Sequence, residues 1–549
     1  MFVGREAELA QLEQAYAEGT FKLQVIYGRR RVGKTALIQQ FIADKPHAQY
    51  FIAQQNSAEI NLEQLSQALA SRKPYPDEKL YPDTGVYPDL YVPEGSPVYR
   101  TFEAAFSNLF ERAERERVIF VIDEYPYLAA CYPGVSSLLQ TLIDRHRGTS
   151  KLFLILCGSS LSFMERQVLG EKSPLYGRRT GQIDLAPFDA FDAAELLGTQ
   201  DDPVKAVELY ALAGGIPLYL AQLDAARSTE WNIAHRLLDR GGLLAIEPDN
   251  LLQQETRKPA AYKSVLSALA AGRTTAREIG DVSRLGASSL HACLNELMSM
   301  RLVRRDDPVA SGRKRAPRYA LMDNLFRFHY GLGLRYDAAA ELGMGEQVAH
   351  VIVSNGEFDT YVGRVFGDAC RQWLMREMRA GQIPLIPTEV GSWWGTPARN
   401  RPEEVDVVAS GISAADGCAA LLLGECKWRN EKVDVAVLDK LRQRATYIKG
   451  TTARTPLYLF SKSGFTEGLV AQARAQDNAH LVSAEEMLRG ELPNAYSSTS
   501  AKRSLGNANL EALREAREAF KGAAEEGGLT DSSNVVDLVR SARRDRTRG

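Results

Sequence analysis

Residues 28–35, GRRRVGKT, have the spacing G-x-x-x-x-G-K-T, in which glycines, a lysine and a hydroxyl can surround a phosphate chain. The glycines let the backbone curl so that successive N–H groups face an anion at a helix N-terminus. LQVIYG before the motif is typical of a buried strand, and TALIQQFIA after it is typical of an amphipathic helix. We therefore expect a site for ATP and Mg²⁺, in which Lys34 neutralises the β- and γ-phosphates and the Thr35 hydroxyl binds the metal. The expected nucleotide-binding residues are Gly28, Arg29, Arg30, Arg31, Val32, Gly33, Lys34 and Thr35.

Two further segments place polar side chains directly after apolar runs. VIFVIDEYP puts Asp123 and Glu124 at the exit of an expected strand, where Asp123 can hold Mg²⁺ and Glu124 can activate a water. KLFLILCGSS puts Ser159 at the end of another, where its hydroxyl can sense the γ-phosphate. For all three side chains the alternative is that they only cap the following helices.

A second possible active site lies near the C-terminus. RPEEVDVVAS (401–410) and ALLLGECKW (420–428) are strand-like runs separated by a glycine-bearing turn. Glu425 and Lys427 share one face because strand side chains alternate, and Asp406 on the adjoining strand can join them. Asp406 and Glu425 could bind Mg²⁺ or Mn²⁺, while Lys427 could stabilise charge on a phosphate. These are the groups that metal-assisted hydrolysis of a phosphodiester requires. The alternative is that this region keeps its fold but is used only for binding, without catalysis.

Four apolar runs predict the sheet that positions the N-terminal residues. LQVIYG, QYFIA, VIFVID and KLFLILCG have the continuous hydrophobicity of strands buried on both faces. Because such strands alternate with amphipathic stretches, the fold class is α/β, with a parallel sheet covered by helices.

Composition narrows the possible classes of protein. The 549 residues carry 67 Lys and Arg against 69 Asp and Glu, so any contact with nucleic acid must come from a local patch. We find no apolar run long enough to cross a membrane and no signal peptide at the N-terminus. The six cysteines form no C-x-x-C pair, which argues against a zinc site and fits a reducing, cytoplasmic location.

The segment 259–321 reads as three helices followed by two strands around a basic turn, and it resembles a winged-helix domain. Its cations could contact the phosphate backbone of DNA without reading sequence, or the wing could instead dock within the protein. These cations are Arg301, Arg304, Arg305, Arg313, Lys314, Arg315 and Arg318.

The motifs FVGREAEL, GRRRVGKT, VIFVIDE, LILCGSS, SPLYGRRTGQIDLAPF and GGIPLYL occur in one order over about residues 1–240. Together they resemble the archaeal/bacterial ATPase family, a STAND branch of P-loop NTPases related to AAA+ proteins. The resemblance implies that Gly4 and Arg5 lie near the adenine and that Arg178 or Arg179 serves as an arginine finger or sensor. It also implies a lid turn at Gly215 and Pro217, and a homo-oligomer.

Residues from about 355 to 485 resemble the PD-(D/E)XK nuclease superfamily, as the C-terminal domain that commonly follows this ATPase family. The resemblance places an acidic residue after Phe366, where this chain has Gly367 and then Asp368. Glu389 is another candidate acid. Because one residue of displacement turns a helical side chain by about 100°, Asp368 is a poor substitute.

These observations predict a P-loop ATPase core (1–185), a helical lid (186–255), a winged helix (256–325), a nuclease-like α/β domain (326–490) and a disordered tail (491–549), with a surface loop at 73–100. We expect an Mg²⁺-dependent ATPase whose nucleotide state controls DNA binding and cleavage. Two alternatives stay open: an ATP-gated switch with an inactive nuclease-like scaffold that binds DNA or a protein, and a DNA-binding protein with negligible hydrolysis.

Overall fold

The computed structural model describes residues 2–70, 98–256, 258–311, 316–396 and 402–489, so most of the expected surface loop and the expected tail lie outside the described residues. The chain forms two compact units. Of the described residues, the first unit contains those within 1–308, 313–372 and 426–430, and the second contains those within 309–312, 373–425 and 431–489.

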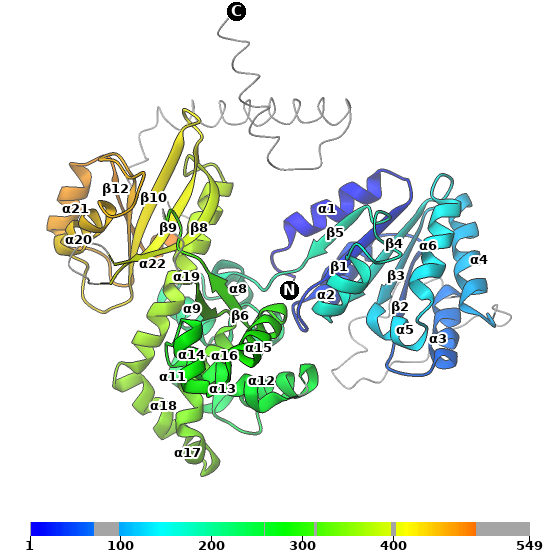
Figure 1. Ribbon diagram of the computed structural model, residues 1–549, viewed down its shortest axis with the longest axis horizontal. Coiled ribbons are helices and arrows are strands. Elements are labelled where there is room, and N and C mark those ends of the chain that lie inside the picture. Colours follow the sequence, from blue (N-terminus) through cyan, green and yellow to red (C-terminus); the bar gives the residue numbers. More distant parts are fainter. Residues whose placement is uncertain (1, 71–97, 257, 312–315, 397–401, 490–549) are drawn as a thin grey trace, which may run out of the picture. The chain divides into compact units, whose positions relative to one another are not determined.

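The first unit begins with a five-stranded parallel sheet in the order β2-β3-β4-β1-β5, which confirms the predicted parallel sheet (Figure 1). Because all strands are parallel, the residues that follow β1, β3 and β4 meet at one edge of the sheet. The strands are β1 (Lys22–Tyr27), β2 (Ala48–Ile52), β3 (Val118–Asp123), β4 (Leu152–Gly158) and β5 (Gly181–Asp184).

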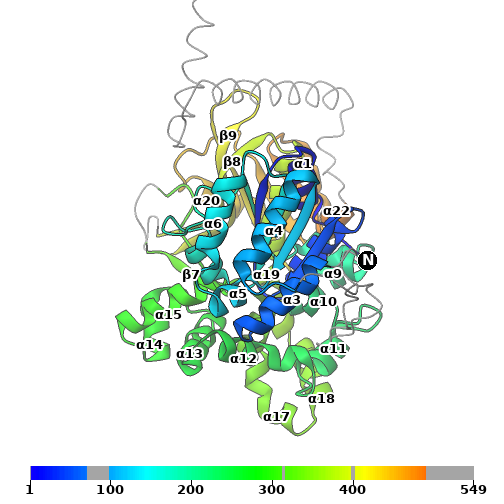
Figure 2. The ribbon, with the colours of Figure 1, turned by 90° about the vertical axis from the view of Figure 1, so that its right-hand side faces the viewer.

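Helices cover both faces of this sheet because neighbouring strand residues face opposite sides. Leu154 of β4 belongs to the core formed with α3, α4 and α6, whereas Phe153 packs against Tyr16 of α1 and Phe41 of α2. Figure 2 shows the helices that cover the first of these faces. The helices are α1 (Glu6–Ala17), α2 (Lys34–Ile42), α3 (Ala58–Ala70), α4 (Phe102–Arg115), α5 (Tyr125–Cys131) and α6 (Val135–His146).

Two short segments connect β4 to β5: α7 (Leu161–Phe163) and the π-helical turn η2 (Met164–Val168). Further helices follow β5. They are α8 (Ala190–Leu197), α9 (Pro203–Ala213), α10 (Pro217–Leu220), α11 (Thr229–Asn232), the π-helical turn η3 (Ile233–Leu237) and α12 (Leu243–Glu255). Within the described residues, no helix combines the length and the apolar character that crossing a membrane would need.

Three helices and a two-stranded antiparallel hairpin come next, in the order that the sequence predicts for residues 259–321. They are α13 (Pro259–Ala270), α14 (Ala276–Ser283), α15 (Ala287–Ser299), β6 (Val303–Asp306) and β7 (Arg318–Leu321). Their apolar residues share one core with α12 and α16. The chain continues through α16 (Asn324–Gly331), the 3₁₀ turn η4 (Gly333–Tyr336), α17 (Asp337–Glu341), α18 (Gly345–Ser354) and α19 (Glu357–Arg379).

The second unit contains a five-stranded mixed sheet in the order β12-β11-β10-β9-β8. Strands β8, β9 and β10 pair antiparallel, and β11 and β12 pair parallel. Its core joins the sheet to α20 through Val408, Leu423, Leu438 and Leu441. The elements are β8 (Leu385–Gly395), β9 (Glu403–Ser413), β10 (Ala419–Lys427), α20 (Val435–Ala445), β11 (Leu457–Ser461), α21 (Glu467–Arg474), β12 (Ala479–Ser483) and α22 (Ala484–Arg489).

Gly215, between α9 and α10, lies against the segment that leaves the sheet. Its carbonyl accepts a hydrogen bond of 2.8 Å from Phe188 N, and a Cβ at Gly215 would lie 1.8 Å from Phe188 O. Because the obstacle is backbone, Gly215→Ala should lower the free energy of unfolding by about 2 kcal/mol or more, measured by urea denaturation. Gly148→Ala is the matched control, since nothing lies within 4 Å of its Cβ position. Equal stability of the two variants would contradict this packing.

Candidate functional site

The loop between β1 and α2 is shaped by glycines and by one positive φ outside glycine. A Cβ at Gly28 would lie 2.5 Å from the carbonyl oxygen of Leu185, so only glycine fits without moving backbone. Gly33 has φ +95° and Arg31 has φ +67°, which turn the chain back toward α2. Val32 is completely buried and anchors the loop.

Lys34, the first residue of α2, points back into this loop. Its Nζ donates to the carbonyl oxygens of Gly28 and Arg29 at 3.0 and 2.9 Å, and the residue is only 7% exposed. Both acceptors are neutral, so they do not cancel the charge of the buried ammonium. A buried cation surrounded by backbone is a favourable place for a phosphate oxygen.

The structure brings together Thr35 and Asp123, the two residues expected to hold Mg²⁺. The Thr35 hydroxyl donates to Asp123 Oδ2 at 3.2 Å, and Glu124 N donates to Asp123 Oδ1 at 2.9 Å. The Tyr50 hydroxyl, from β2, donates to the same Oδ2 at 2.5 Å. A hydroxyl and a carboxylate at this distance are hard oxygen donors of the kind that Mg²⁺ prefers. Sequence reasoning missed Tyr50 because only the pairing of β2 with β3 brings it there.

Glu124 and Ser159 form the second polar pair at this edge. The Ser159 hydroxyl donates to Glu124 Oε2 at 3.1 Å. Burial, followed by the charge of Asp123, raises the pKa of Glu124 above its ordinary value. Glu124 precedes α5 without capping it through its side chain, and Ser160, not Ser159, occupies the cap position of α7. The described contacts thus join Glu124 and Ser159 to each other at the sheet edge where the phosphates would lie.

The N-terminal segment and the lid turn both reach the loop. Arg5 donates to the carbonyls of Val32 and Ala186 at 3.2 and 2.8 Å, and its guanidinium lies 4.4 Å from the ring centroid of Phe188. Burial lowers the pKa of Arg5 from its ordinary value. Pro217 Cγ lies 3.8 Å from the position of a Cβ on Gly33.

Gly4 packs beside the same ring and has φ +62°. A contact of Gly4 or Arg5 with adenine stays a prediction.

Arg178 and Arg179 do not contact the phosphate loop in the described residues. Arg178 forms two hydrogen bonds with Asp144 of α6 at 2.8 and 2.7 Å, and Arg179 donates to Leu169 O at 2.8 Å. Both residues precede β5, at the amino end of a strand parallel to β1, whereas the phosphate loop follows the carboxyl end of β1. The single chain therefore does not bring either residue to the loop, and a role as arginine finger stays a prediction for a neighbouring copy.

The three arginines of the phosphate loop form ion pairs with residues in or next to the helices that follow the sheet. Sequence reasoning did not predict these ion pairs. Arg29 pairs with Asp323 at 2.6 Å, and both side chains are buried. Arg31 pairs with Glu247 of α12. Arg30 pairs with Glu255 at the end of α12 at 3.4 Å.

Three cations of the expected DNA-binding wing are paired with carboxylates of the same chain. Arg301 binds Asp184 at the end of β5 at 2.5 and 2.6 Å. Arg304 and Arg305 bind Asp306 and Asp307, at 3.0 and 3.5 Å. These pairs reduce the positive charge that the wing offers to a phosphate backbone. Residues 312–315, which include three of the expected cations, lie outside the described residues.

Asp368 lies in α19 at the centre of three arginines. It contacts Arg304 and Arg327 at 3.0 and 3.2 Å, and Arg371 at 2.5 Å. Burial by itself raises its pKa, but these guanidinium groups outweigh burial and lower the pKa well below its ordinary value. Asp368 is therefore a buried ion-pair centre between α19, β6 and α16. Gly367 precedes it, with nothing within 4 Å of its Cβ position.

In the second unit, Glu425 is bound by an arginine. Arg444 of α20 contacts both carboxylate oxygens of Glu425 at 2.9 and 2.8 Å and Glu403 at 2.9 Å. The pairing of Val407 with Gly424 puts Asp406 and Glu425 at adjoining positions, but β9 is irregular here, because Gly391 pairs with Val408 and Trp393 with Val405.

This irregularity breaks the simple alternation on which the expected trio depends. Val405 and Val408 join the same core although two residues, Asp406 and Val407, lie between them, so counting alternate residues does not give the face of Asp406. Lys427 lies in β10, as Glu425 does. Glu389 lies on β8 opposite Ser410. Among the described residues, no cluster of three or more His, Cys, Asp or Glu could hold a metal ion.

Comparison with known proteins matches an ATPase domain to the N-terminal part of the chain. A family model described as an ATPase domain predominantly from Archaea matches residues 2–223, and one for archaeal and bacterial proteins of unknown function matches residues 334–438. An uncharacterised protein of Methanocaldococcus jannaschii is 29% identical over 434 residues, 79% of this chain and 88% of the relative. An uncharacterised ATP-binding protein of the same archaeon is 51% identical over 45 residues, 8% of this chain and 76% of the relative.

Solved structures give weaker matches. The Walker-type ATPase of Pyrococcus abyssi is 22% identical with a TM-score of 0.43, covering 60% of this chain and 96% of that one. The ORC2 protein of Aeropyrum pernix is 14% identical with a TM-score of 0.36, covering 63% and 95%. Scores below 0.5 do not establish a shared arrangement.

The role of Asp368 can be tested by stability. Asp368→Asn leaves three arginines facing a neutral group, so the free energy of unfolding should fall by about 3–5 kcal/mol at pH 7, measured by urea denaturation. A carboxylate with a lowered pKa stabilises the fold above its unfolded pKa, so this difference should stay constant from pH 8 to pH 5. Asp416→Asn, at an exposed residue, is the control and should change stability little. A loss for Asp368→Asn no larger than for the control would contradict a buried ion-pair centre.

Proposed function

We propose that this chain, which belongs to the ATPase family found predominantly in Archaea, binds Mg·ATP at the loop 28–35 and hydrolyses it. One observation carries the proposal. Thr35 and Asp123 share a hydrogen bond beside Lys34, while the neighbouring Glu124 is held by Ser159 at the same sheet edge. The side chains for the phosphates, the metal and the water therefore lie in one place.

Each residue has a defined task in the reaction. Lys34 and the N–H groups at the start of α2 bind the β- and γ-phosphates, and Thr35 and Asp123 hold Mg²⁺. The bound metal supplies neutralisation of phosphate charge. Glu124 accepts the proton of the attacking water, and Ser159 positions the Glu124 carboxylate.

We further propose that the chain works as an ATP-gated switch. Arg29 and Arg31 connect the phosphate loop to Asp323 and Glu247, and Glu247 also accepts a hydrogen bond of 2.8 Å from Tyr219 of α10. A change of loop conformation on nucleotide binding would thus act on α10, α12 and α16 together. Binding of DNA or of a protein partner in one nucleotide state is the output that we propose.

Glu124→Gln tests the hydrolysis step. The change keeps the size of the side chain but removes the base, so ATP turnover should fall by about 100-fold or more while ATP still binds. Phosphate release under single-turnover conditions measures the first effect, and titration with a fluorescent ATP analogue measures the second. Glu165→Gln, a glutamate of η2 outside the phosphate site, is the control and should turn over ATP like the wild type. Turnover by Glu124→Gln at the wild-type rate would remove Glu124 from the mechanism.

A second function, metal-dependent cleavage of DNA, has some support in the second unit. Asp406 and Glu425 each lie one residue beyond the pair of Val407 with Gly424, so two carboxylates of the kind that binds a metal occur at the same end of this strand pairing. The pairing of Glu425 with Arg444 opposes it, because the guanidinium occupies both carboxylate oxygens. The nuclease-like unit is therefore proposed as a scaffold in this state, with cleavage requiring release of Arg444.

Incubation with plasmid DNA separates the two functions. We expect the wild type to cleave weakly or not at all with Mg²⁺ or Mn²⁺, measured by gel electrophoresis of supercoiled plasmid. If cleavage occurs, Asp406→Ala should abolish it and Asp416→Ala should not. Cleavage that persists in Asp406→Ala would exclude this pair of carboxylates as the site.

A further inference from the structure

Hydrolysis of ATP benefits from a cation on the γ-phosphate, and the chain does not supply one from Arg178 or Arg179. Both are bound near the amino end of β5, to Asp144 and to the carbonyl of Leu169. Charge that builds on the transferred phosphoryl group is stabilised in many phosphate-transfer enzymes by an arginine from the same chain or from a partner. A candidate must reach the place where Glu124 activates water.

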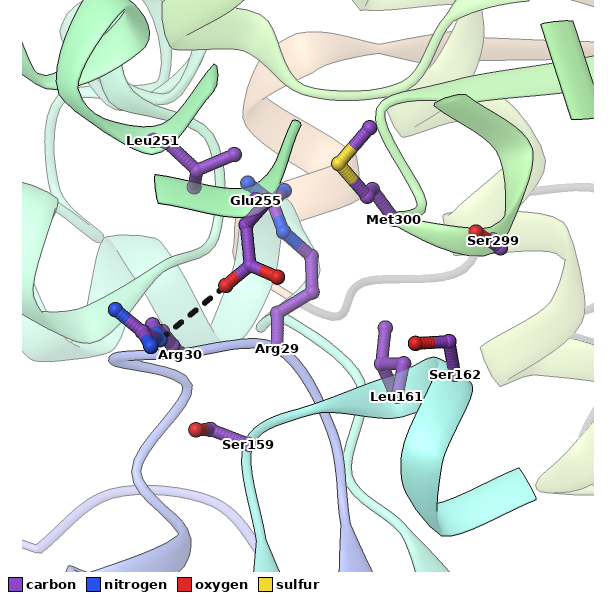
Figure 3. Close-up of a pocket in the computed structure, with 9 residues that line it drawn as sticks. All are labelled: Arg29, Arg30, Ser159, Leu161, Ser162, Leu251, Glu255, Ser299 and Met300. Carbon is purple, nitrogen blue, oxygen red and sulfur yellow. Dashed lines mark ion pairs between the residues drawn. The ribbon is translucent and has the colours of Figure 1, made fainter. Parts of the chain in front are cut away.

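Arg30 lies close to this part of the sheet edge. It lines a pocket together with Ser159, whose hydroxyl donates to Glu124, and Figure 3 shows both side chains at the same end of this pocket. Its NH2 group also lies 3.5 Å from the hydroxyl of Tyr127 in α5, the helix that begins directly after Glu124. The guanidinium of Arg30 therefore lines the same pocket as the serine whose hydroxyl contacts the Glu124 carboxylate.

Among the three loop arginines, Arg30 is the one with the most exposed contacts. The side chains of Arg29 and Asp323 are 6% and 2% exposed, so this buried ion pair stabilises the fold. Glu247, the partner of Arg31, is 4% exposed. Arg30 and Glu255, in contrast, are 39% and 30% exposed, and their pair is the longest at 3.4 Å. A pair in contact with solvent contributes little and is readily exchanged for a phosphate contact.

The end of α12 holds Arg30 in its present position. Gln254 Oε1 accepts a hydrogen bond of 2.6 Å from Arg30, beside the ion pair with Glu255 that is dashed in Figure 3. A carboxylate and an amide oxygen on this guanidinium compete with the oxygens of a γ-phosphate. The contact can therefore restrain the arginine before the nucleotide binds.

We propose that Arg30 is the catalytic arginine of this ATPase, supplied within the same chain and restrained by Glu255 and Gln254. The proposal rests on ATP hydrolysis at loop 28–35. In the reaction, the water oxygen bonds to the γ-phosphorus, the bond to the β–γ bridging oxygen breaks, and that oxygen leaves with the electron pair on ADP. The water proton passes to Glu124, and Arg30 stabilises the negative charge on the γ-phosphoryl oxygens.

Single-turnover hydrolysis of ATP by the full chain tests this role. Arg30→Ala should slow the chemical step by about 100-fold or more, with a much smaller change in the dissociation constant for a fluorescent ATP analogue. Arg30→Lys should recover part of the rate, because a lysine supplies charge without the planar fork of the guanidinium. Glu255→Gln should hydrolyse ATP at least as fast as the wild type because it weakens the restraint.

Controls separate catalysis from structure and from assembly. Arg335→Ala removes another half-exposed arginine, paired with Glu357 at 2.7 Å, and should leave the rate unchanged. Mixing Arg30→Ala with Lys34→Ala should not restore turnover, since an arginine acting within its own chain cannot complement another copy. Thermal unfolding of each variant establishes that it folds. If Arg30→Ala does not fold, the hydrolysis rates of Arg30→Lys and Glu255→Gln test the proposal.

A wild-type rate in Arg30→Ala, a loss confined to ATP binding, or restoration by mixing would each overturn the inference while leaving ATP hydrolysis in place. An unchanged rate in Arg30→Lys, together with a slower Glu255→Gln, would overturn it as well. A wild-type chain that turns over no ATP would instead refute the proposed function, and this inference with it.

Discussion

The turn at Gly28 is the constraint on which the nucleotide site depends. At this residue β1 ends against the carbonyl of Leu185, and no side chain fits between the two backbones. The close approach directs the loop back over the start of α2, so that Lys34 is buried inside it beside two carbonyl oxygens. Because the strands are parallel, Asp123 and Ser159, which lie at the ends of neighbouring strands, are placed at the same edge of the sheet.

The charges around this edge divide into two groups with different physical roles. Buried pairs such as Arg29 with Asp323 hold the phosphate loop to the helices that follow the sheet, and loss of one partner would leave an uncompensated charge. Half-exposed contacts such as Arg30 with Glu255 can exchange partners at little cost. In the switch that we propose, a loop that is held firmly by some arginines and loosely by another would pass a change at the phosphates to α12 and α16.

Local patterns predicted the parts of the site that are close in sequence or that follow from strand order. The loop motif and the apolar runs were sufficient for the parallel sheet and for placing Asp123 beside Thr35. Local patterns could not predict contacts between residues that are far apart in the sequence. Asp323 is 294 residues from Arg29, and Tyr50 is 73 residues from Asp123. Counting alternate residues also failed near Asp406, where β9 departs from regular pairing, and no local signal marked Arg444 as the partner of Glu425.

The central claim is that the loop of residues 28–35 binds a magnesium-bound nucleoside triphosphate. Isothermal titration of the full chain with ATP in the presence of Mg²⁺ measures this most directly. We expect saturable binding with one ATP per chain, strengthened by Mg²⁺ because Thr35 and Asp123 share the metal with the phosphates. An absence of binding at millimolar ATP, or binding that Lys34→Ala leaves unchanged, would contradict the account.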